Sequence, residues 1–160
     1  MVVRRADPAE APLLSQIVER AYAVYVERIG RRPAPMDDDY EAKTRRGEVF
    51  VADDGAVAGL IVLVERPDHL LVENVAVDPA RRGTGVGRAL LEYAESHAAA
   101  RGLRELRLYT NEAMTENLAF YPRLGYCEVG RRVEDGFRRV YYSKRVPTLA
   151  ARWRGRQGKS

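Results

Sequence analysis

The stretch Glu73-Asn-Val-Ala-Val-Asp-Pro-Ala-Arg-Arg-Gly-Thr-Gly-Val-Gly-Arg88 decides how this chain is interpreted. Its first half is typical of a buried strand, and its second half leads through three alternating glycines into a helical segment. Glycine permits a positive φ and lets a ligand approach the backbone amides closely. The amides at a helix N-terminus carry about half a positive charge, to which Arg82 and Arg88 add. The stretch therefore predicts a site for a diphosphate, with a glycine-rich connection that binds nothing as the alternative.

Two familiar phosphate-binding motifs do not fit this turn. It lacks the Gly-Lys-Ser/Thr sequence of a nucleoside-triphosphate loop. Its glycines, Gly83, Gly85 and Gly87, are spaced Gly-x-Gly-x-Gly, whereas the dinucleotide fingerprint is Gly-x-Gly-x-x-Gly after the first strand. The sequence therefore argues against both of these ligand classes.

Hydrophobic periodicity and turn residues predict the elements on either side of the turn. Strands are expected at residues 1–5, 48–52, 56–65, 70–77, 103–110, 126–133 and 137–146. Helices are expected from the Asp7-Pro8 cap to residue 29 and at residues 38–46, 86–101 and 114–124. The resulting order, β-α-α-β-β-β-α-β-α-β-β, predicts one α/β domain with a mixed sheet over residues 1–146.

The net charge of +4 comes from the end of the chain. The sequence has 160 residues, with 27 basic and 23 acidic side chains. Residues 147–160 contain four of the basic side chains and no acid, so residues 1–146 are neutral. This balance argues against a general polyanion binder. We expect the tail to be disordered and solubilising; nucleic-acid binding through its arginines and Trp153 is the alternative that we do not favour.

Several other classes are excluded or disfavoured. The longest uncharged apolar run, Ala56–Val64, is far shorter than the ~20 residues of a membrane span. The first residues lack the apolar core of a signal peptide, so we expect a cytoplasmic protein. Cys127 is the only cysteine, which excludes internal disulfides and cysteine-cluster metal sites. His69 and His97 lack metal-ligand spacing, so no metal site is predicted.

Two motifs in this order resemble the GNAT N-acetyltransferase superfamily. The first is Val77-Asp78-Pro79 followed by Arg82-x-x-Gly85-x-Gly87, and the second is Phe120-Tyr121-x-x-x-Gly125-Tyr126. The predicted element order also matches the family over residues 1–146. The resemblance implies an α+β fold in which about four helices flank a mixed sheet of about seven strands. It also implies that the fourth and fifth strands splay apart and that the pantetheine arm of acetyl-CoA lies between them. The subfamily is not identified.

The resemblance also assigns cofactor-binding residues by position. The diphosphate of acetyl-CoA is expected at the turn formed by Arg82, Gly83, Thr84, Gly85, Val86, Gly87 and Arg88. The backbone of Val75, Ala76 and Val77 is expected to bind pantetheine and the acetyl group, and to stabilise the oxyanion. Many relatives have an asparagine at the position of Met114, so that contact with CoA is assigned instead to Asn117, one helical turn before Tyr121.

Two residues are candidates for the chemistry. Tyr121 matches the tyrosine that protonates the departing thiolate in many relatives; a core aromatic role is its alternative. An amine with a pKa near 10.4 is about one part in 10³–10⁴ neutral at pH 7, so a base is needed. Glu73 is our candidate, acting directly or through water, and an exposed glutamate paired with an arginine is the alternative. Tyr109 and Asn111 are secondary candidates.

The resemblance predicts direct transfer of an acetyl group from acetyl-CoA to a primary amine in a ternary complex. The acceptor is a small molecule or a peptide, and the sequence does not choose among polyamine, amino acid, antibiotic or protein amines. The run Asp37-Asp38-Asp39 attracts a cationic amine or simply begins a helix. A non-catalytic acyl-CoA-binding module is the alternative function. Homodimerisation is common in the family, but no segment establishes it here.

Overall fold

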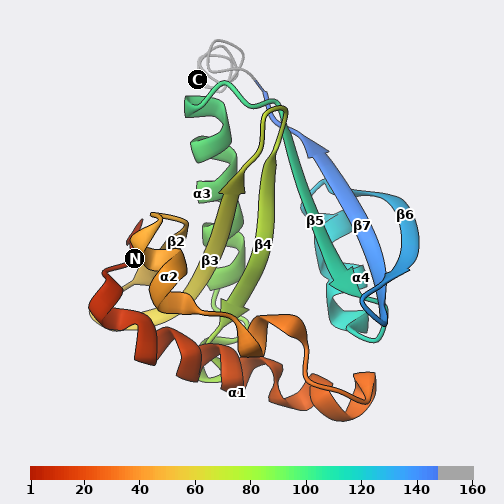
Figure 1. Ribbon diagram of the computed structural model, residues 1–160. Helices are drawn as coiled ribbons and strands as arrows, with labels where there is room; N and C mark the ends of the chain where they lie inside the picture. Colours follow the sequence, from red (N-terminus) through yellow and green to blue (C-terminus); the bar gives the residue numbers. More distant parts are fainter. Residues whose placement is uncertain (148–160) are drawn as a thin grey trace.

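Seven strands form one mixed sheet in the order β1-β2-β3-β4-β5-β7-β6 within residues 1–147, the part of the chain that this computed structural model describes (Figure 1). The strands are β1 Val2–Arg5, β2 Val49–Asp53, β3 Val57–Glu65, β4 Leu70–Val77, β5 Glu105–Asn111, β6 Cys127–Glu134 and β7 Phe137–Arg145. This confirms the predicted mixed seven-stranded sheet. Apart from Pro147, the predicted tail lies outside the described residues.

Four α-helices occur in the same range, as predicted. They are α1 Ala11–Ile29, α2 Tyr40–Arg45, α3 Val86–Ala100 and α4 Thr115–Arg123, joined by 3-10 turns η1 Pro8–Glu10, η2 Ala34–Asp37 and η3 Pro79–Arg81. The first helix begins later than the Asp7-Pro8 cap predicted. Pro12 has no N–H to donate to the carbonyl of Pro8, so the residues capped by Asp7 form a 3-10 turn instead of the first α-helical turn.

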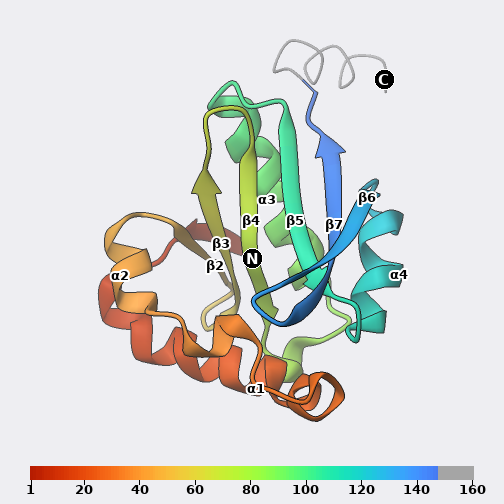
Figure 2. The same ribbon diagram turned by 45° about the vertical axis from the view of Figure 1, so that its right-hand side comes forward.

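The helices cover the two faces of the sheet. The views in Figures 1 and 2 place α3 behind β3–β5 and α1 and α2 on the opposite face, while α4 packs beside β6. One buried core lies under α3 and α4 and includes Leu90, Leu106 and Val140. The other lies under α1 and α2 and includes Leu14, Ile17 and Leu60. No helix in the described range is long and apolar enough to span a bilayer.

Strands β4 and β5 are parallel and separate soon after they begin. They pair only from Leu70–Val72 to Leu106–Leu108. Beyond Val72, the side of β4 that faces β5 has no strand partner among residues 1–147, and Figure 1 shows the two strands diverging toward their C-terminal ends. The expected splay is therefore present, and it leaves backbone groups of β4 free to bind another molecule.

A β-bulge in β4 lies at the point where the strands diverge. Leu63 of β3 pairs with Val72 and Val62 pairs with Asn74, so Glu73 is an extra residue without a partner on β3. A bulge changes the alternation of side chains along a strand. Val72 packs in the core under α3, whereas the next two side chains, Glu73 and Asn74, both contact the α1–α2 side.

Candidate active site

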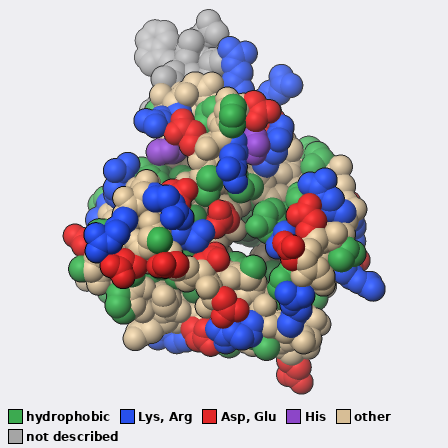
Figure 3. All heavy atoms as spheres, viewed as in Figure 1, with side chains coloured by type: hydrophobic (Ala, Val, Ile, Leu, Met, Phe, Trp, Pro, Cys, Tyr) green, Lys and Arg blue, Asp and Glu red, His purple; other side chains and the backbone are tan. Residues whose placement is uncertain are grey.

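Two cavities meet at the open edge of β4. We call the first the turn groove: it has a volume of about 360 Å³ and runs between the glycine turn, α1 and α4. The second, the inner pocket, has a volume of about 150 Å³ and lies among η2, β4, β5 and β7. Five residues line both: Tyr22, Val75, Met114, Asn117 and Tyr121. In Figure 3 the molecule is hollowed near its centre, with acidic side chains at the rim.

The glycine turn lines the turn groove. Gly83 and Gly85 have φ of 76° and 87°, values that favour glycine over any residue with a Cβ. Nothing within residues 1–147 accepts a hydrogen bond from the backbone N–H groups of residues 83–88, which precede and begin α3. These free donors at a helix N-terminus form an arrangement that binds anions.

The polar side chains of the turn have separate roles. Thr84 donates to the carbonyl of Arg81 at 2.5 Å, and Arg81 pairs with Asp54, so these contacts hold the turn in place. Arg82 reaches the carbonyl of Ala21 on α1 at 3.5 Å. Arg88 lines the groove and forms no ion pair in the described part of the chain. The side chain of Val86 packs in the core, so this residue offers only its backbone to a ligand.

Glu73 lies in the inner pocket and is paired with a lysine, not an arginine. Its carboxylate accepts a hydrogen bond from Lys43 of α2, whose Nζ also lies 3.7 Å from Asp38. Burial lowers the pKa of Lys43, but the hydrogen bond and charge of Glu73 outweigh it and the pKa is raised. The pKa of Asp38 is also raised, because burial disfavours its charged form more than Lys43 stabilises it.

The three consecutive aspartates separate in the structure. Asp37 is exposed and pairs with Arg32 at 3.1 Å. Asp39 caps α2 by accepting a hydrogen bond from the N–H of Ala42 at 3.0 Å. Only Asp38 lines the inner pocket. Asp39 therefore serves as a helix cap, and Asp38 contributes a carboxylate to the wall of the inner pocket.

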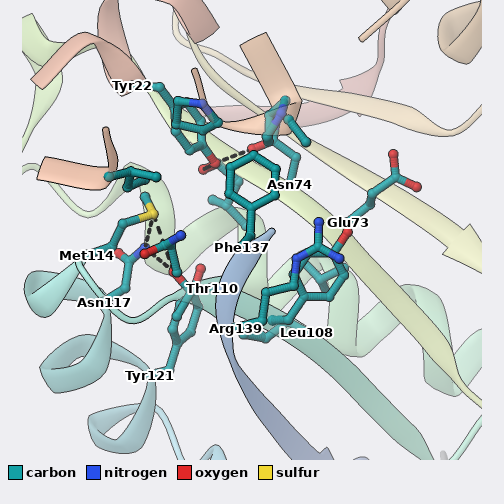
Figure 4. Close-up of a pocket in the computed structure, with 18 of the residues that line it drawn as sticks. Tyr22, Glu73, Asn74, Leu108, Thr110, Met114, Asn117, Tyr121, Phe137 and Arg139 are labelled. Carbon is teal, nitrogen blue, oxygen red and sulfur yellow. Dashed lines mark hydrogen bonds between the residues drawn. The ribbon is translucent and has the colours of Figure 1, made fainter. Parts of the chain in front are cut away.

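Asn74 is a buried polar residue that the sequence analysis missed. Its side-chain oxygen accepts a hydrogen bond from the Tyr22 hydroxyl, and its amide donates to Tyr40 at 3.0 Å. Tyr40 in turn donates to the carbonyl of Pro35 at 2.6 Å. An asparagine within the hydrophobic run Leu-Leu-Val-Glu-Asn-Val-Ala-Val was the available signal. Through these contacts Asn74 fixes α1, α2 and η2 around the pocket, and its bond with Tyr22 is drawn in Figure 4.

Tyr121 lies where the two cavities join. Its side chain is 7% exposed and packs against Phe120, Tyr126 and Tyr142, which satisfies the core aromatic alternative as well. Burial raises the pKa of its hydroxyl above the ordinary value, so the group keeps its proton at neutral pH. That hydroxyl makes no hydrogen bond to any other described residue and remains available to a ligand.

Asn117 and Met114 lie beside Tyr121 in both cavities. The amide of Asn117 donates to Thr110 at 3.0 Å and approaches the sulfur of Met114 at 4.0 Å (Figure 4). These contacts fix the orientation of Asn117. The secondary candidates, Tyr109 and Asn111, also line the inner pocket, and Asn111 accepts a hydrogen bond from the N–H of Ala113 at 2.9 Å.

Arg139 of β7 is the second side chain that the sequence analysis missed. It projects into the inner pocket beside Phe137 (Figure 4) and is only 11% exposed. The chain has 27 basic residues, and nothing in the local pattern distinguishes this one. Its position depends on the pairing of β7 with β5, which the sequence does not display. Within residues 1–147, no cluster of three histidine, cysteine or acidic side chains is suited to a metal ion.

Comparison with known proteins agrees with this geometry. The mouse protein N-alpha-acetyltransferase 80 is 43% identical over 95 residues, which are 59% of this chain and 28% of that protein. The chain thus matches less than a third of that relative. A putative GNAT-family acetyltransferase from Desulfovibrio desulfuricans has a TM-score of 0.73 at 21% identity, covering 91% of this chain and 99% of that one. The PaiA N-acetyltransferase of Thermoplasma acidophilum, solved in complex with coenzyme A, has a TM-score of 0.73 at 16% identity, covering 90% and 98%.

A family model places the chain more firmly than any single relative. The model described as the acetyltransferase (GNAT) family matches residues 14–126. This range includes the glycine turn, Glu73 and Tyr121, and it covers well over half of the chain. The chain is therefore a member of the GNAT acetyltransferase family.

Proposed function

We propose that the protein transfers an acetyl group from acetyl-CoA to a primary amine. The observation that carries this proposal is the junction of the two cavities at the open edge of β4 beside Tyr121. A donor in the turn groove and an acceptor in the inner pocket would meet there. This arrangement favours direct attack in a ternary complex, because both molecules reach the same point from different sides.

The donor would bind through backbone groups and two arginines. The free N–H groups of residues 83–88, with Arg82 and Arg88, are suited to the diphosphate of CoA. The unpaired edge of Val75–Val77 is suited to the amide groups of pantetheine, which would add to the sheet like a short strand. Asn117 is the side chain that would contact this arm. The neighbour solved with coenzyme A supports the choice of donor.

The acceptor amine must lose a proton before it attacks. Glu73 is the base in this proposal, directly or through a water molecule, and its place on the wall of the inner pocket supports that role. Lys43 keeps a positive charge beside it, because the raised pKa of Lys43 lies above the physiological range. The hydrogen bond from Lys43 fixes the position of the Glu73 carboxylate on this wall.

Bond exchange then follows at the cavity junction. The neutral amine forms a C–N bond with the acetyl carbonyl carbon, and the oxyanion would accept hydrogen bonds from the backbone of β4. The C–S bond breaks, and the leaving thiolate takes the proton of the Tyr121 hydroxyl. The attacking nitrogen, now part of the amide, releases its surplus N–H proton, which restores that hydroxyl. The high pKa of that buried hydroxyl supports this role, since the group is protonated before each turnover.

The proposal is tested by combining the protein with acetyl-CoA and a panel of primary amines. Release of free thiol together with an N-acetylated product, identified by mass spectrometry, is the expected result. Calorimetry with CoA supplies the second measurement. Arg88→Ser should raise the Kd for CoA about tenfold through the loss of a charged contact, whereas Arg45→Ser, at an exposed position of α2, should leave it unchanged.

Two results would count against this function. Failure to bind CoA would remove the donor, and tight CoA binding without turnover of any amine would favour a non-catalytic acyl-CoA-binding module. Cytoplasmic location and homodimer formation remain predictions from the sequence, as does the basic tail as a separate segment.

A further inference from the structure

The inner pocket contains a buried guanidinium that the reaction above does not use. Arg139 is 11% exposed, and its carbon Cζ lies 4.4 Å from the ring centroid of Tyr109 and 5.6 Å from that of Phe137. Only its Nη1 makes a hydrogen bond within residues 1–147, to Glu134 at 3.1 Å. A guanidinium has five N–H donors, so most of them remain unpaired beside the cavity.

The charges on the two walls of this pocket are opposite. On the side of α2 and β4, Asp38 and Glu73 share the single cation Lys43, which leaves one negative charge among these described groups.

On the side of the β6–β7 hairpin, Arg139 and Arg132 share the carboxylate of Glu134, which leaves one positive charge. Asp38, Glu73 and Arg139 all line the inner pocket, where partly buried charges interact more strongly than on the open surface.

We infer that the acceptor is a compact amino carboxylate whose carboxylate binds Arg139 while its amine faces the acidic wall. This inference rests on the proposed acetyl transfer. Arginine binds carboxylates with two parallel hydrogen bonds, which the unpaired donors of Arg139 can supply. A polyamine would instead place a second ammonium beside a buried guanidinium, and the like charges would repel.

The size of the pocket agrees with a short acceptor. Its volume of about 150 Å³ is less than half the 360 Å³ of the turn groove. The smaller space favours an amino acid with a small side chain or a short ω-amino acid over a large acceptor. Phe137 and Tyr109 supply apolar surface for the carbon chain between the two charged groups.

The test compares acids with their amides. Glycine, alanine, β-alanine and γ-aminobutyrate are assayed against the corresponding carboxamides, with acetyl-CoA saturating. We expect the wild-type protein to favour the acids at least tenfold in kcat/KM. Arg139→Gln should reduce that preference at least tenfold, chiefly through a higher KM for the acids, and Arg139→Lys should retain part of it.

Arg131→Gln is the matched control. Arg131 is a salt-bridged arginine of the same hairpin, 2.9 Å from Glu128, but it does not line the inner pocket and does not share a carboxylate with Arg139. Its replacement should leave the acid-to-amide ratio unchanged. A purely structural role for Arg139 would lower the thermal stability and reduce the rates with acids and amides equally, which would overturn the inference.

A binding measurement separates this inference from the proposed function. With CoA present, calorimetry compares the wild-type protein's affinity for the N-acetyl derivatives of the same acids and amides. Preference for the N-acetyl acids supports the inference even if Arg139→Gln does not fold. Equal binding of acids and amides, or binding of neither, overturns it. Turnover of amines that lack a carboxylate, with no such preference, would leave the acetyltransferase function standing and reject only the carboxylate site.

Discussion

The Tyr22 hydroxyl on α1 donates a hydrogen bond to the side-chain oxygen of Asn74 on β4, one residue after the bulge. The amide of the same asparagine donates to Tyr40 on α2. One buried side chain thus connects two helices to the strand that borders both cavities. The consequence is that the shape of the inner pocket depends on a hydrogen-bonded group as well as on hydrophobic packing.

Asn74→Ala should reduce the free energy of unfolding by about 2–3 kcal/mol, because Tyr22 and Tyr40 both lose a buried partner. Urea denaturation followed by circular dichroism measures the change. Asn111→Ala is the control: its amide is partly exposed and accepts one backbone hydrogen bond, so we expect a loss of about 1 kcal/mol or less. Equal losses in the two variants would contradict the linking role of Asn74.

Gly59→Ala should lower the stability of the fold, whereas Gly87→Ala should not lower it. A Cβ at Gly59 would lie 2.8 Å from the carbonyl oxygen of Ala76 and 3.0 Å from a methyl group of Val86, so overpacking should cost about 1–3 kcal/mol. A Cβ at Gly87 would lie in ordinary contact, 3.7 Å from Phe120, in a helix that favours alanine. Thermal unfolding of both variants checks this, and a stable Gly59→Ala protein would refute it.

Tyr121→Phe should lower kcat about 10²-fold, in the range of a lost general acid. Tyr126→Phe removes the same atom from a ring 5.6 Å away that lines neither cavity and whose buried hydroxyl has no partner in the described chain, so its kcat should not change. Since burial raises the pKa of Tyr121, wild-type kcat should not decline between pH 8 and 10. Equal rates for wild type and Tyr121→Phe would remove the tyrosine from the mechanism.

Asp38→Asn should stabilise the fold slightly at pH 7 and not at pH 3. Burial raises the folded-state pKa of Asp38, so its ionisation favours the unfolded state once the pH exceeds the unfolded value of about 3.9. Below that pH the carboxyl is neutral in both states and the penalty disappears. Asp37→Asn, at an exposed neighbour, should give no gain. Urea denaturation at several pH values distinguishes the two, and a gain that grows as the pH falls would have the wrong sign.

Local sequence patterns predicted the elements and the glycine turn, because each depends on residues close together in the chain. The turn signals at Asp54-Gly55 and Asp135-Gly136 fall between paired strands, as expected. Helix α1 begins one turn later than the Asp7-Pro8 cap predicts, because Pro12 has no N–H with which to complete the first α-helical turn.

The arrangement of side chains around the inner pocket could not be predicted from local sequence patterns. The partner of Glu73 depends on a one-residue bulge, and the position of Arg139 depends on β7 inserting between β5 and β6. Both are pairings between distant segments. Simple alternation along β4 would direct Asn74 toward α3 with Val72, whereas the structure directs it toward α1.

Strand β4 serves the two cavities with successive residues. Residues 72–75 line the inner pocket beside η2, β5 and β7, residues 75–77 line the turn groove beside η3 and α3, and Val75 is shared. Changes in η2 or in the β6–β7 hairpin can therefore reshape one cavity without disturbing the backbone of the other. Such a division is modular: an enzyme built on it could acquire a new acceptor while retaining the same donor, and engineering of specificity should begin at Pro33–Asp38 and Phe137–Arg139.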